Sequence, residues 1–246
     1  MTPDVPDLAS SFGAVSEPYD RVRLVYPEEA VTWMLPAGAR RVVDVGAGTG
    51  KLTGALAARG LRVTAVEPDD RMRAVLAARL PGVTALRGSG EAIPVGDDEE
   101  DAVLVAQAWH WMDAGAAARE AARVLRPGGR LGIVWNVMDV EVDWVRELDA
   151  LLHPGSRAAG RAIEPGPFPG FGPVEHASFA HVHPMSPEEV VALAGSISRI
   201  IVLPDHERAR VLDDIRTLLA GHPDTAGSTA LDLPYRADVY RAQLGG

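Results

Sequence analysis

The sequence contains no cysteine, a single lysine and few aromatic residues, and each shortage excludes or limits a kind of chemistry. Without cysteine, the chain cannot build a disulfide scaffold, a thiolate metal site or a cysteine nucleophile. Lys51 is the only lysine, so Schiff-base chemistry has one candidate residue. No apolar run approaches the roughly 18 residues that span a bilayer, and acidic residues stand where a signal peptide would be cationic. We therefore expect a cytoplasmic protein that does not bind membranes.

Basic residues are also in short supply relative to acidic ones. The chain has 34 acidic and 24 basic side chains, which gives a formal net charge of −10. This balance weighs against a general nucleic-acid binder, because such a protein needs a basic surface to displace the counterions of the phosphates. The 246 residues, 47% of them hydrophobic, are enough for a sizeable core. No repeat of fixed period and no polar linker divides them, which favours a single domain.

From residue 40 to residue 136 the sequence alternates between patterns typical of buried strands and of helices. Strands are expected at 40–46, 61–67, 83–87, 101–109 and 130–136, and helices at 26–36, 49–60, 69–82 and 113–125. Strands joined by helices of this length predict a parallel sheet with helices on both faces. Beyond residue 136 the pattern predicts helices at 143–154, 187–200 and 205–221 and strands at 174–183 and 229–242.

The sharpest motif is the loop VVDVGAGTG, residues 42–50, between the first strand and the next helix. A phosphate-binding P-loop needs glycine where this chain has Val45 and a hydroxyl where it has Leu52, so that interpretation fails. A dinucleotide fingerprint needs glycine or alanine at the position of Lys51. That mismatch weakens the interpretation but leaves an NAD(P)-dependent oxidoreductase open as an alternative.

A third interpretation fits both the loop and the second strand. Asp44 precedes Gly46, Gly48 and Gly50, and Glu67 with Pro68 ends the second strand. This pattern resembles the class I S-adenosylmethionine-dependent methyltransferases that act on small molecules, over roughly residues 17–136. The resemblance implies a Rossmann-like seven-stranded mixed sheet whose final pair is antiparallel. It also implies an N-terminal arm and helical lid (1–36), a cofactor-binding core (37–136), and helical insertions after the fifth strand with the last strands (137–246).

The resemblance implies S-adenosylmethionine as the cofactor and S-adenosylhomocysteine as its product. Glycines let the loop backbone approach the methionine and ribose parts, and Glu67 is placed to accept hydrogen bonds from both ribose hydroxyls. Ser89 stands where relatives carry an aspartate that binds adenine, so Glu91 or backbone groups are alternatives for that contact. The residues assigned to the cofactor are Tyr19, Arg23, Asp44, Gly46, Ala47, Gly48, Glu67, Pro68, Ser89, Gly90, Glu91 and Gln107.

The segment after the fourth strand reads Trp-His-Trp and points toward the expected acceptor site. His110 is the candidate general base by position, although a hydrogen bond to a loop or to the cofactor is an equal alternative. On an extended chain both tryptophans would lie on one side and His110 on the other. Residues that could line the acceptor pocket are Trp109, Trp111, Trp135 and Asn136, with ordinary packing as the alternative for the tryptophans. Tyr26 is assigned to the acceptor as a polar contact of the lid, and an exposed tyrosine on a surface helix is its alternative.

The acceptor is expected to be a small organic molecule. The sequence resembles relatives that methylate carboxylates such as trans-aconitate, or natural-product intermediates, and Arg21, Arg23 or Arg199 could clamp an anionic acceptor. A non-catalytic protein that binds S-adenosylmethionine is a further alternative. His181 and His183 share one side of a predicted strand but lack a carboxylate partner at suitable spacing, so no metal is expected. A monomer or a homodimer fits equally well.

Overall fold

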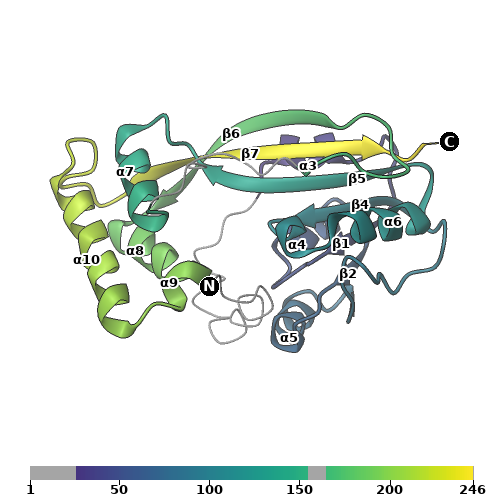
Figure 1. Ribbon diagram of the computed structural model, residues 1–246, viewed down its shortest axis with the longest axis horizontal. Helices are drawn as coiled ribbons and strands as arrows, with labels where there is room; N and C mark the ends of the chain where they lie inside the picture. Colours follow the sequence, from purple (N-terminus) through teal and green to yellow (C-terminus); the bar gives the residue numbers. More distant parts are fainter. Residues whose placement is uncertain (1–25, 155–164, 246) are drawn as a thin grey trace. The chain divides into compact units, whose positions relative to one another are not determined.

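The computed structural model describes residues 26–154 and 165–245 (Figure 1). These residues form two compact units, one with residues 26–136, 165–179 and 237–245 and one with residues 137–154 and 180–236. One seven-stranded sheet has the order β3-β2-β1-β4-β5-β7-β6. Its strands are β1 (Arg41–Val45), β2 (Arg62–Val66), β3 (Thr84–Leu86), β4 (Glu100–Ala106), β5 (Leu125–Met138), β6 (Glu175–Met185) and β7 (Leu231–Gln243).

The first five strands are parallel, as the alternating pattern predicts. Val43 of β1 lies opposite Thr64 of β2 on one side and opposite Val103 of β4 on the other. Figure 1 shows the arrow of β7 running opposite to that of β5, so the sheet is mixed. The chain first builds outward from β1 to β3 and then restarts at β4 on the other side of β1. Parallel sheets bind ligands at such a reversal of strand order, beyond the carboxyl ends of the strands.

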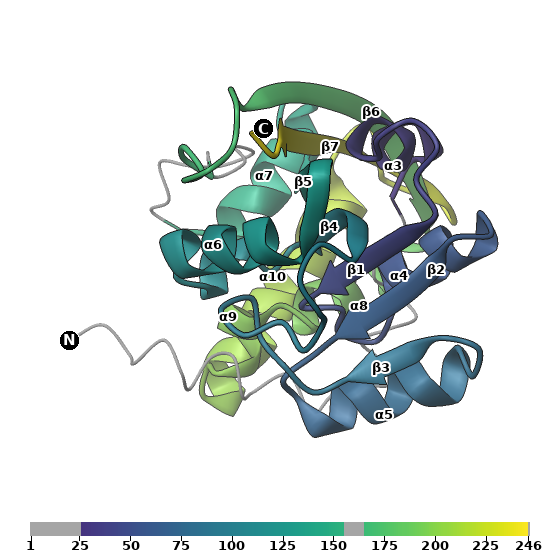
Figure 2. The same ribbon diagram turned by 90° about the vertical axis from the view of Figure 1, so that its right-hand side faces the viewer.

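Helices cover both faces of the parallel strands in the first unit. Its helices are α3 (Glu28–Met34), α4 (Lys51–Ala58), α5 (Asp70–Arg79), the short 3-10 helix η2 (Trp109–Trp111) and α6 (Ala114–Val124). Buried residues of α3 and α4, such as Met34 and Leu56, form one cluster with Val42 and Leu104 of the sheet. Alternate residues of a strand point to opposite faces. Figure 2 shows α6 on the side of β4 opposite to α4.

Strand β5 begins at Leu125, earlier than the predicted start at residue 130. Leu125 pairs with Glu100, and a shift of register comes next, before Ala102 pairs with Arg130. The sequence Arg-Pro-Gly-Gly, which predicts a turn before the strand, is instead an irregular part of the strand itself. Gly128 has a φ of +81° there, which the missing side chain permits.

The second unit holds the helices α7 (Asp143–Leu152), α8 (Pro187–Gly195), α9 (Ser198–Ile201) and α10 (Asp205–Gly221). They enclose a core that includes the fully buried Leu148 and Ile215. The single helix predicted over 187–200 is instead two helices, α8 ending at Gly195 and α9 beginning at Ser198, and between them Ser196 Oγ donates to the carbonyl of Leu193 at 2.7 Å. Within residues 26–154 and 165–245, no helix combines the length and the apolar character of a membrane span.

Candidate functional site

The glycine loop after β1 turns sharply and is fastened to β2. The backbone N–H groups of Gly46 and Ala47 both donate to the carbonyl of Val66, at 2.8 and 3.1 Å. Gly46 has a φ of +68°, and a Cβ atom placed on it would stand 2.5 Å from Cβ of Ala108. The loop therefore touches the segment after β4, and only glycine fits at this contact.

Asp44, the last acidic residue before the loop, is completely buried. Thr53 Oγ1 donates to its Oδ2 at 2.6 Å, whereas Oδ1 has no hydrogen-bond partner within the described part of the chain. Burial, together with the charge of Glu67, raises the pKa of Asp44 to about 7 although the Thr53 hydrogen bond opposes the shift. A buried carboxyl group with one unpaired oxygen is a place where a bound cation would be stabilised.

Glu67 holds the glycine loop and the start of α5 with its two oxygens. Oε2 accepts a hydrogen bond from Gly48 N at 2.7 Å, and Oε1 accepts one from Asp69 N at 2.9 Å. Burial raises the pKa of Glu67, and the two backbone hydrogen bonds oppose that shift. Each carboxylate oxygen has a further lone pair. The geometry therefore leaves room for ribose hydroxyls and adds a structural role that the motif did not reveal.

The segment from residue 88 to residue 94 forms a small loop fastened to α6. Ser89 and Ala92 exchange two backbone hydrogen bonds of 3.2 and 3.3 Å. Glu91 Oε1 accepts a hydrogen bond from the backbone N–H of Asp113, the N-cap of α6, at 2.8 Å. Glu91, an alternative for the adenine contact, thus uses one of its two carboxylate oxygens to anchor the loop.

Met112 fills the space between this loop and the glycine loop. A Cβ atom on Gly90 would collide with Met112 Sδ, and one on Gly46 would lie 3.4 Å from Met112 Cε. Met112 was not among the residues selected from the sequence. A methionine carries no motif signal, and its place between two loops depends on the packing of the whole edge of the sheet.

Gln107 ends β4 in an unusual backbone conformation. Its φ is +58°, a value that residues other than glycine rarely adopt. The backbone N–H of Gln107 donates to the carbonyl of Val134 at 3.0 Å, and its side-chain Nε2 donates to the carbonyl of Asn136 at 3.0 Å. Strained residues held in this way cluster at functional sites. The structure therefore brings together Gln107, a candidate for the cofactor site, and Asn136, a candidate for the acceptor site.

The Trp-His-Trp segment differs from the extended chain that the alternating pattern predicts. It forms the 3-10 helix η2, in which successive side chains point in three directions, so the two tryptophans do not share one side. Trp109 is 4% exposed and meets Phe168 edge-on, with 5.3 Å between ring centroids. This contact is interior packing, the alternative kept open for Trp109.

His110 is exposed and lies beside two tryptophans. Its ring centroid is 4.7 Å from that of Trp111, and its Nδ1 accepts a long hydrogen bond of 3.5 Å from Trp135 Nε1. Burial of part of the ring among its neighbours lowers the pKa of His110. His110, Trp111 and Trp135 therefore form one cluster, although Trp135 is 25 residues away in the sequence.

Other assigned residues lie elsewhere. Tyr19 and Arg23, with Arg21, are outside the described residues. Tyr26 is half-buried and packs against the cluster under α3 and α4, and Pro68 is exposed.

The candidate residues of the second unit make structural contacts within that unit. Arg199, a candidate clamp for an anion, donates to the carbonyl of Leu152 at 2.7 Å and so holds the end of α7. His181 stacks on Tyr235, with 5.9 Å between ring centroids. Among the described residues no group of three or more histidine, aspartate or glutamate side chains could hold a metal ion.

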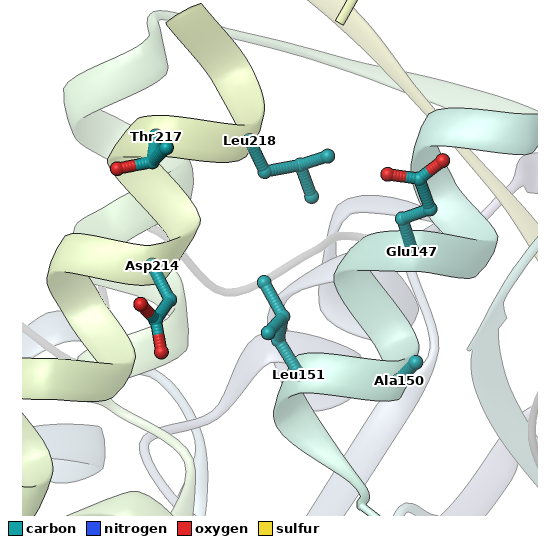
Figure 3. A pocket seen from close by; sticks show the side chains of 6 residues that line it. All are labelled: Glu147, Ala150, Leu151, Asp214, Thr217 and Leu218. Carbon is teal, nitrogen blue, oxygen red and sulfur yellow. The ribbon is translucent and has the colours of Figure 1, made fainter. Parts of the chain in front are cut away.

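A groove of about 440 Å³ lies between α7 and α10 (Figure 3). Figure 3 shows Leu151 and Leu218 facing each other across it, with Glu147 and Asp214 beside them. None of the residues selected from the sequence lines this groove.

Comparisons with known proteins agree with the geometry. The chain matches the model of the methyltransferase domain family over residues 43–133. An uncharacterized methyltransferase of Mycobacterium tuberculosis (strain H37Rv) is 47% identical over 245 residues, which cover 99% of this chain and 100% of that protein. An uncharacterized methyltransferase-like protein of Schizosaccharomyces pombe is 30% identical over 235 residues, which cover 92% of each.

Solved structures give the same fold. A proposed type II methyltransferase of Anaeromyxobacter dehalogenans has a TM-score of 0.67 at 24% identity, covering 90% of this chain and 97% of that one. Phosphoethanolamine N-methyltransferase 2 of Haemonchus contortus, in complex with S-adenosyl-L-methionine, has a TM-score of 0.56 at 15% identity. The alignment covers 95% of this chain and 57% of that one. At these identities the likeness shows the fold alone.

Proposed function

We propose that this chain, which belongs to the class I S-adenosylmethionine-dependent methyltransferases, methylates a small organic molecule. The observation that carries the proposal is the arrangement of Asp44, Gly46 and Glu67 at the reversal of strand order. A buried carboxyl oxygen without a partner among the described residues, a side-chain-free loop and a second carboxylate lie along one edge of the sheet. These groups match a ligand that carries an ammonium group, a sulfonium and a ribose.

Residues of the first unit would hold the cofactor. Asp44 Oδ1 would balance the positive charge of the cofactor, directly or through water. Glu67 would accept hydrogen bonds from the ribose hydroxyls with its remaining lone pairs. Ser89 and Gly90 would border the adenine, and Gln107 the methionine part. When bound, S-adenosylmethionine supplies an electrophilic methyl group on a sulfonium sulfur. The structural neighbour from Haemonchus contortus, which holds this molecule, supports the choice of cofactor.

The acceptor would meet the cofactor beside η2. His110, Trp111, Trp135 and Asn136 would line its site, since Trp135 contacts His110 and Asn136 contacts Gln107. Methyl transfer is an in-line displacement that discharges a sulfonium, so orientation and exclusion of water supply most of the rate. The sequence resemblance assigns Tyr19, Arg23 and Tyr26 to a lid. Of these only Tyr26 lies within the described residues, where it packs against the hydrophobic cluster of α3 and α4. The proposed acceptor class is a small carboxylate or a natural-product intermediate.

Binding experiments separate this function from its alternatives. We expect S-adenosylhomocysteine to raise the melting temperature and NADH to leave it unchanged, because the position of Lys51 lacks the third glycine of a dinucleotide loop. Stabilisation by NADH without stabilisation by S-adenosylhomocysteine would identify an oxidoreductase instead. Binding of S-adenosylhomocysteine without methyl transfer to any of a wide panel of acceptors would identify a non-catalytic binding protein.

A further inference from the structure

The groove between α7 and α10 has an apolar floor and one acidic residue at each end. Leu151 of α7 and Leu218 of α10 form the floor, and both are half-buried. Figure 3 shows Glu147 level with Leu218 at one end, and Asp214 level with Leu151 at the other. The two exposed carboxylates therefore occupy diagonally opposite corners of the groove, with the leucines between them.

The positions of these residues on the two helices set the distance between the charges. On each helix the acid precedes the leucine by four residues, which is about 6 Å along a helix axis. Packed helices lie about 8–10 Å apart, so the diagonal between the two carboxylates is roughly 10 Å. The groove therefore offers two negative charges, about two helical turns apart, on either side of an apolar strip.

The two acids of the groove differ from the other acids of α7 and α10. Within the described residues, each of the others lies within 3.9 Å of a basic side chain: Asp143 of Arg146, Asp149 of His153, Asp205 of Arg208, Glu207 of His206, and Asp213 of Arg216. In the described part of the chain, no basic side chain pairs with Glu147 or Asp214. The acids that lack a partner are thus the two that line the groove.

The hollow continues toward the end of α10 without meeting a positive charge. A second part of about 340 Å³ is lined by Glu147, Thr217, Leu218, Gly221, His222 and Pro223. Nδ1 of His222 accepts a hydrogen bond from the backbone N–H of Asp224 at 3.1 Å, which requires an unprotonated nitrogen. The last carbonyl groups of a helix also carry a partial negative charge. Both parts of the hollow therefore favour a cationic partner.

We propose that this groove binds an amphipathic α-helix of another protein, with apolar side chains on Leu151 and Leu218 and two basic side chains on Glu147 and Asp214. Residues seven apart in an α-helix lie on one face, about 10.5 Å from each other, and residues three and four positions along lie between them. A basic residue at each end of such a stretch and leucines between them match the spacing in the groove. Binding in a groove between helices is a common mode of helix recognition.

Other occupants fit this groove less well. It is open rather than enclosed, whereas a pocket for a small molecule buries most of the ligand. A second copy of this chain carries a net charge of −10, so its approach to an acidic groove is opposed by repulsion. Ion pairs at exposed carboxylates contribute little energy each, so binding of the helix is weak and depends on salt.

Synthetic peptides test the spacing directly. A fluorescent peptide of about 18 residues, long enough to be helical, carries arginines seven positions apart and leucines at the third and fourth positions between them. One control peptide has glutamates in place of the arginines, and another has the second arginine two positions further on, on the opposite side of the helix. We expect the full chain to bind the first peptide with a Kd below about 1 mM, and both controls at least about tenfold more weakly.

Variants of the chain locate the binding. Glu147→Gln and Asp214→Asn should each weaken binding of the first peptide by about three- to tenfold. Asp213→Asn is the matched control on α10, because Asp213 lies beside Arg216 and does not line the groove, and it should leave binding unchanged. A chain with both Glu147→Arg and Asp214→Arg should prefer the glutamate peptide.

Several results would overturn the proposal. They are equal affinity for the arginine and glutamate peptides, an effect of Asp213→Asn as large as that of Asp214→Asn, or no exchange of preference in the doubly reversed chain. Binding of 1,10-diaminodecane without binding of the first peptide would identify a site for a small dication instead. Self-association in sedimentation experiments that Glu147→Gln abolishes would identify a second copy of the chain as the occupant.

Discussion

Glu67 Oε2 lies 2.7 Å from the backbone nitrogen of Gly48, so the carboxylate assigned to the ribose also fixes the shape of the glycine loop. Its other oxygen accepts from the N–H of Asp69. One side chain thus joins the loops after β1 and β2. The loss of this residue should therefore affect the loop before any ligand arrives.

Replacing Glu67 with glutamine should weaken binding of S-adenosylhomocysteine by about ten- to a hundredfold, since a hydrogen bond to a charged group is worth roughly 1.5–3 kcal/mol. The glutamine side chain has one acceptor oxygen, whereas the backbone N–H groups of Gly48 and Asp69 each donate to a separate oxygen of Glu67. The melting temperature should therefore fall as well. Calorimetry and thermal unfolding measure the two effects. Glu147→Gln, on the exposed groove of α7, is the matched control and should change neither. Unchanged affinity in Glu67→Gln would remove Glu67 from the cofactor site.

The stability of the ligand-free protein should fall between pH 4 and pH 7 because of Asp44. Its pKa is raised by burial from 3.8 to about 7, so the folded state holds the proton more tightly than the unfolded state. Its contribution to stability is therefore fully present below pH 4 and is lost as the pH rises to about 7, at about 1.4 kcal/mol per pKa unit. Urea unfolding across this range should show a slope that Asp44→Asn removes. Equal slopes in the two proteins would contradict the prediction.

The same carboxyl group should make binding of the cationic cofactor pH-dependent. A sulfonium or ammonium group near Asp44 Oδ1 favours the ionised form, so affinity for S-adenosylmethionine should rise as the pH passes through about 7. Calorimetry in two buffers of different ionisation enthalpy should detect proton release on binding. Asp44→Asn should release no proton, and release of equal size in that variant would place the titrating group elsewhere.

Gly46→Ala should destabilise the protein more than Gly60→Ala, and only the first should abolish binding of S-adenosylhomocysteine. Both glycines have positive φ, +68° and +77°, so both variants carry backbone strain of about 1 kcal/mol or more. At Gly46 the new methyl group would also press on Ala108, whereas no described atom lies within 4 Å of the same position on Gly60. Urea unfolding and calorimetry compare the pair. Equal losses of stability in the two variants would show that the loop moves enough to relieve the clash with Ala108.

Replacing Arg123 with lysine should lower the free energy of unfolding. Its guanidinium donates to the carbonyls of Ile93 and Val95, at 2.8 and 2.9 Å, and to the carboxylates of Glu120 and Asp97. These carboxylates raise the pKa of Arg123. A lysine has three donors and no planar fork, so Arg123→Lys should lose about 1–2 kcal/mol in chemical unfolding. Arg119→Lys, exposed on the same helix, should lose less than about 0.5 kcal/mol.

Local patterns in the sequence predicted the parts of the candidate site that lie close together in the chain. The loop from Asp44 to Gly50 and the acid Glu67 could be assigned because they belong to one strand–helix–strand unit with a characteristic spacing. The contact between Trp135 and His110, and that between Glu91 and the backbone of Asp113, were not found. These contacts join residues 22 to 25 positions apart on separate elements, and only the packed sheet brings them together.

The shape predicted for the Trp-His-Trp segment was wrong for a related reason. Alternation assumes that a strand continues, but β4 ends at Ala106 and Gln107 turns the chain with a positive φ. The backbone hydrogen bonds of Gln107 to β5 and of Trp111 to Ala108 then wind the segment into η2. A neighbouring strand, which a local pattern does not contain, decides this turn.

The contact between Gly46 and Ala108 joins the two halves of the proposed reaction site mechanically. Ala108 immediately precedes η2, and η2 carries His110, so a shift of the glycine loop is passed on within two residues to the imidazole. An adjustment of the loop to one ligand must therefore alter the geometry offered to the other. Such coupling is reciprocal, so a bound methyl donor and a bound acceptor should change each other's affinity by the same factor.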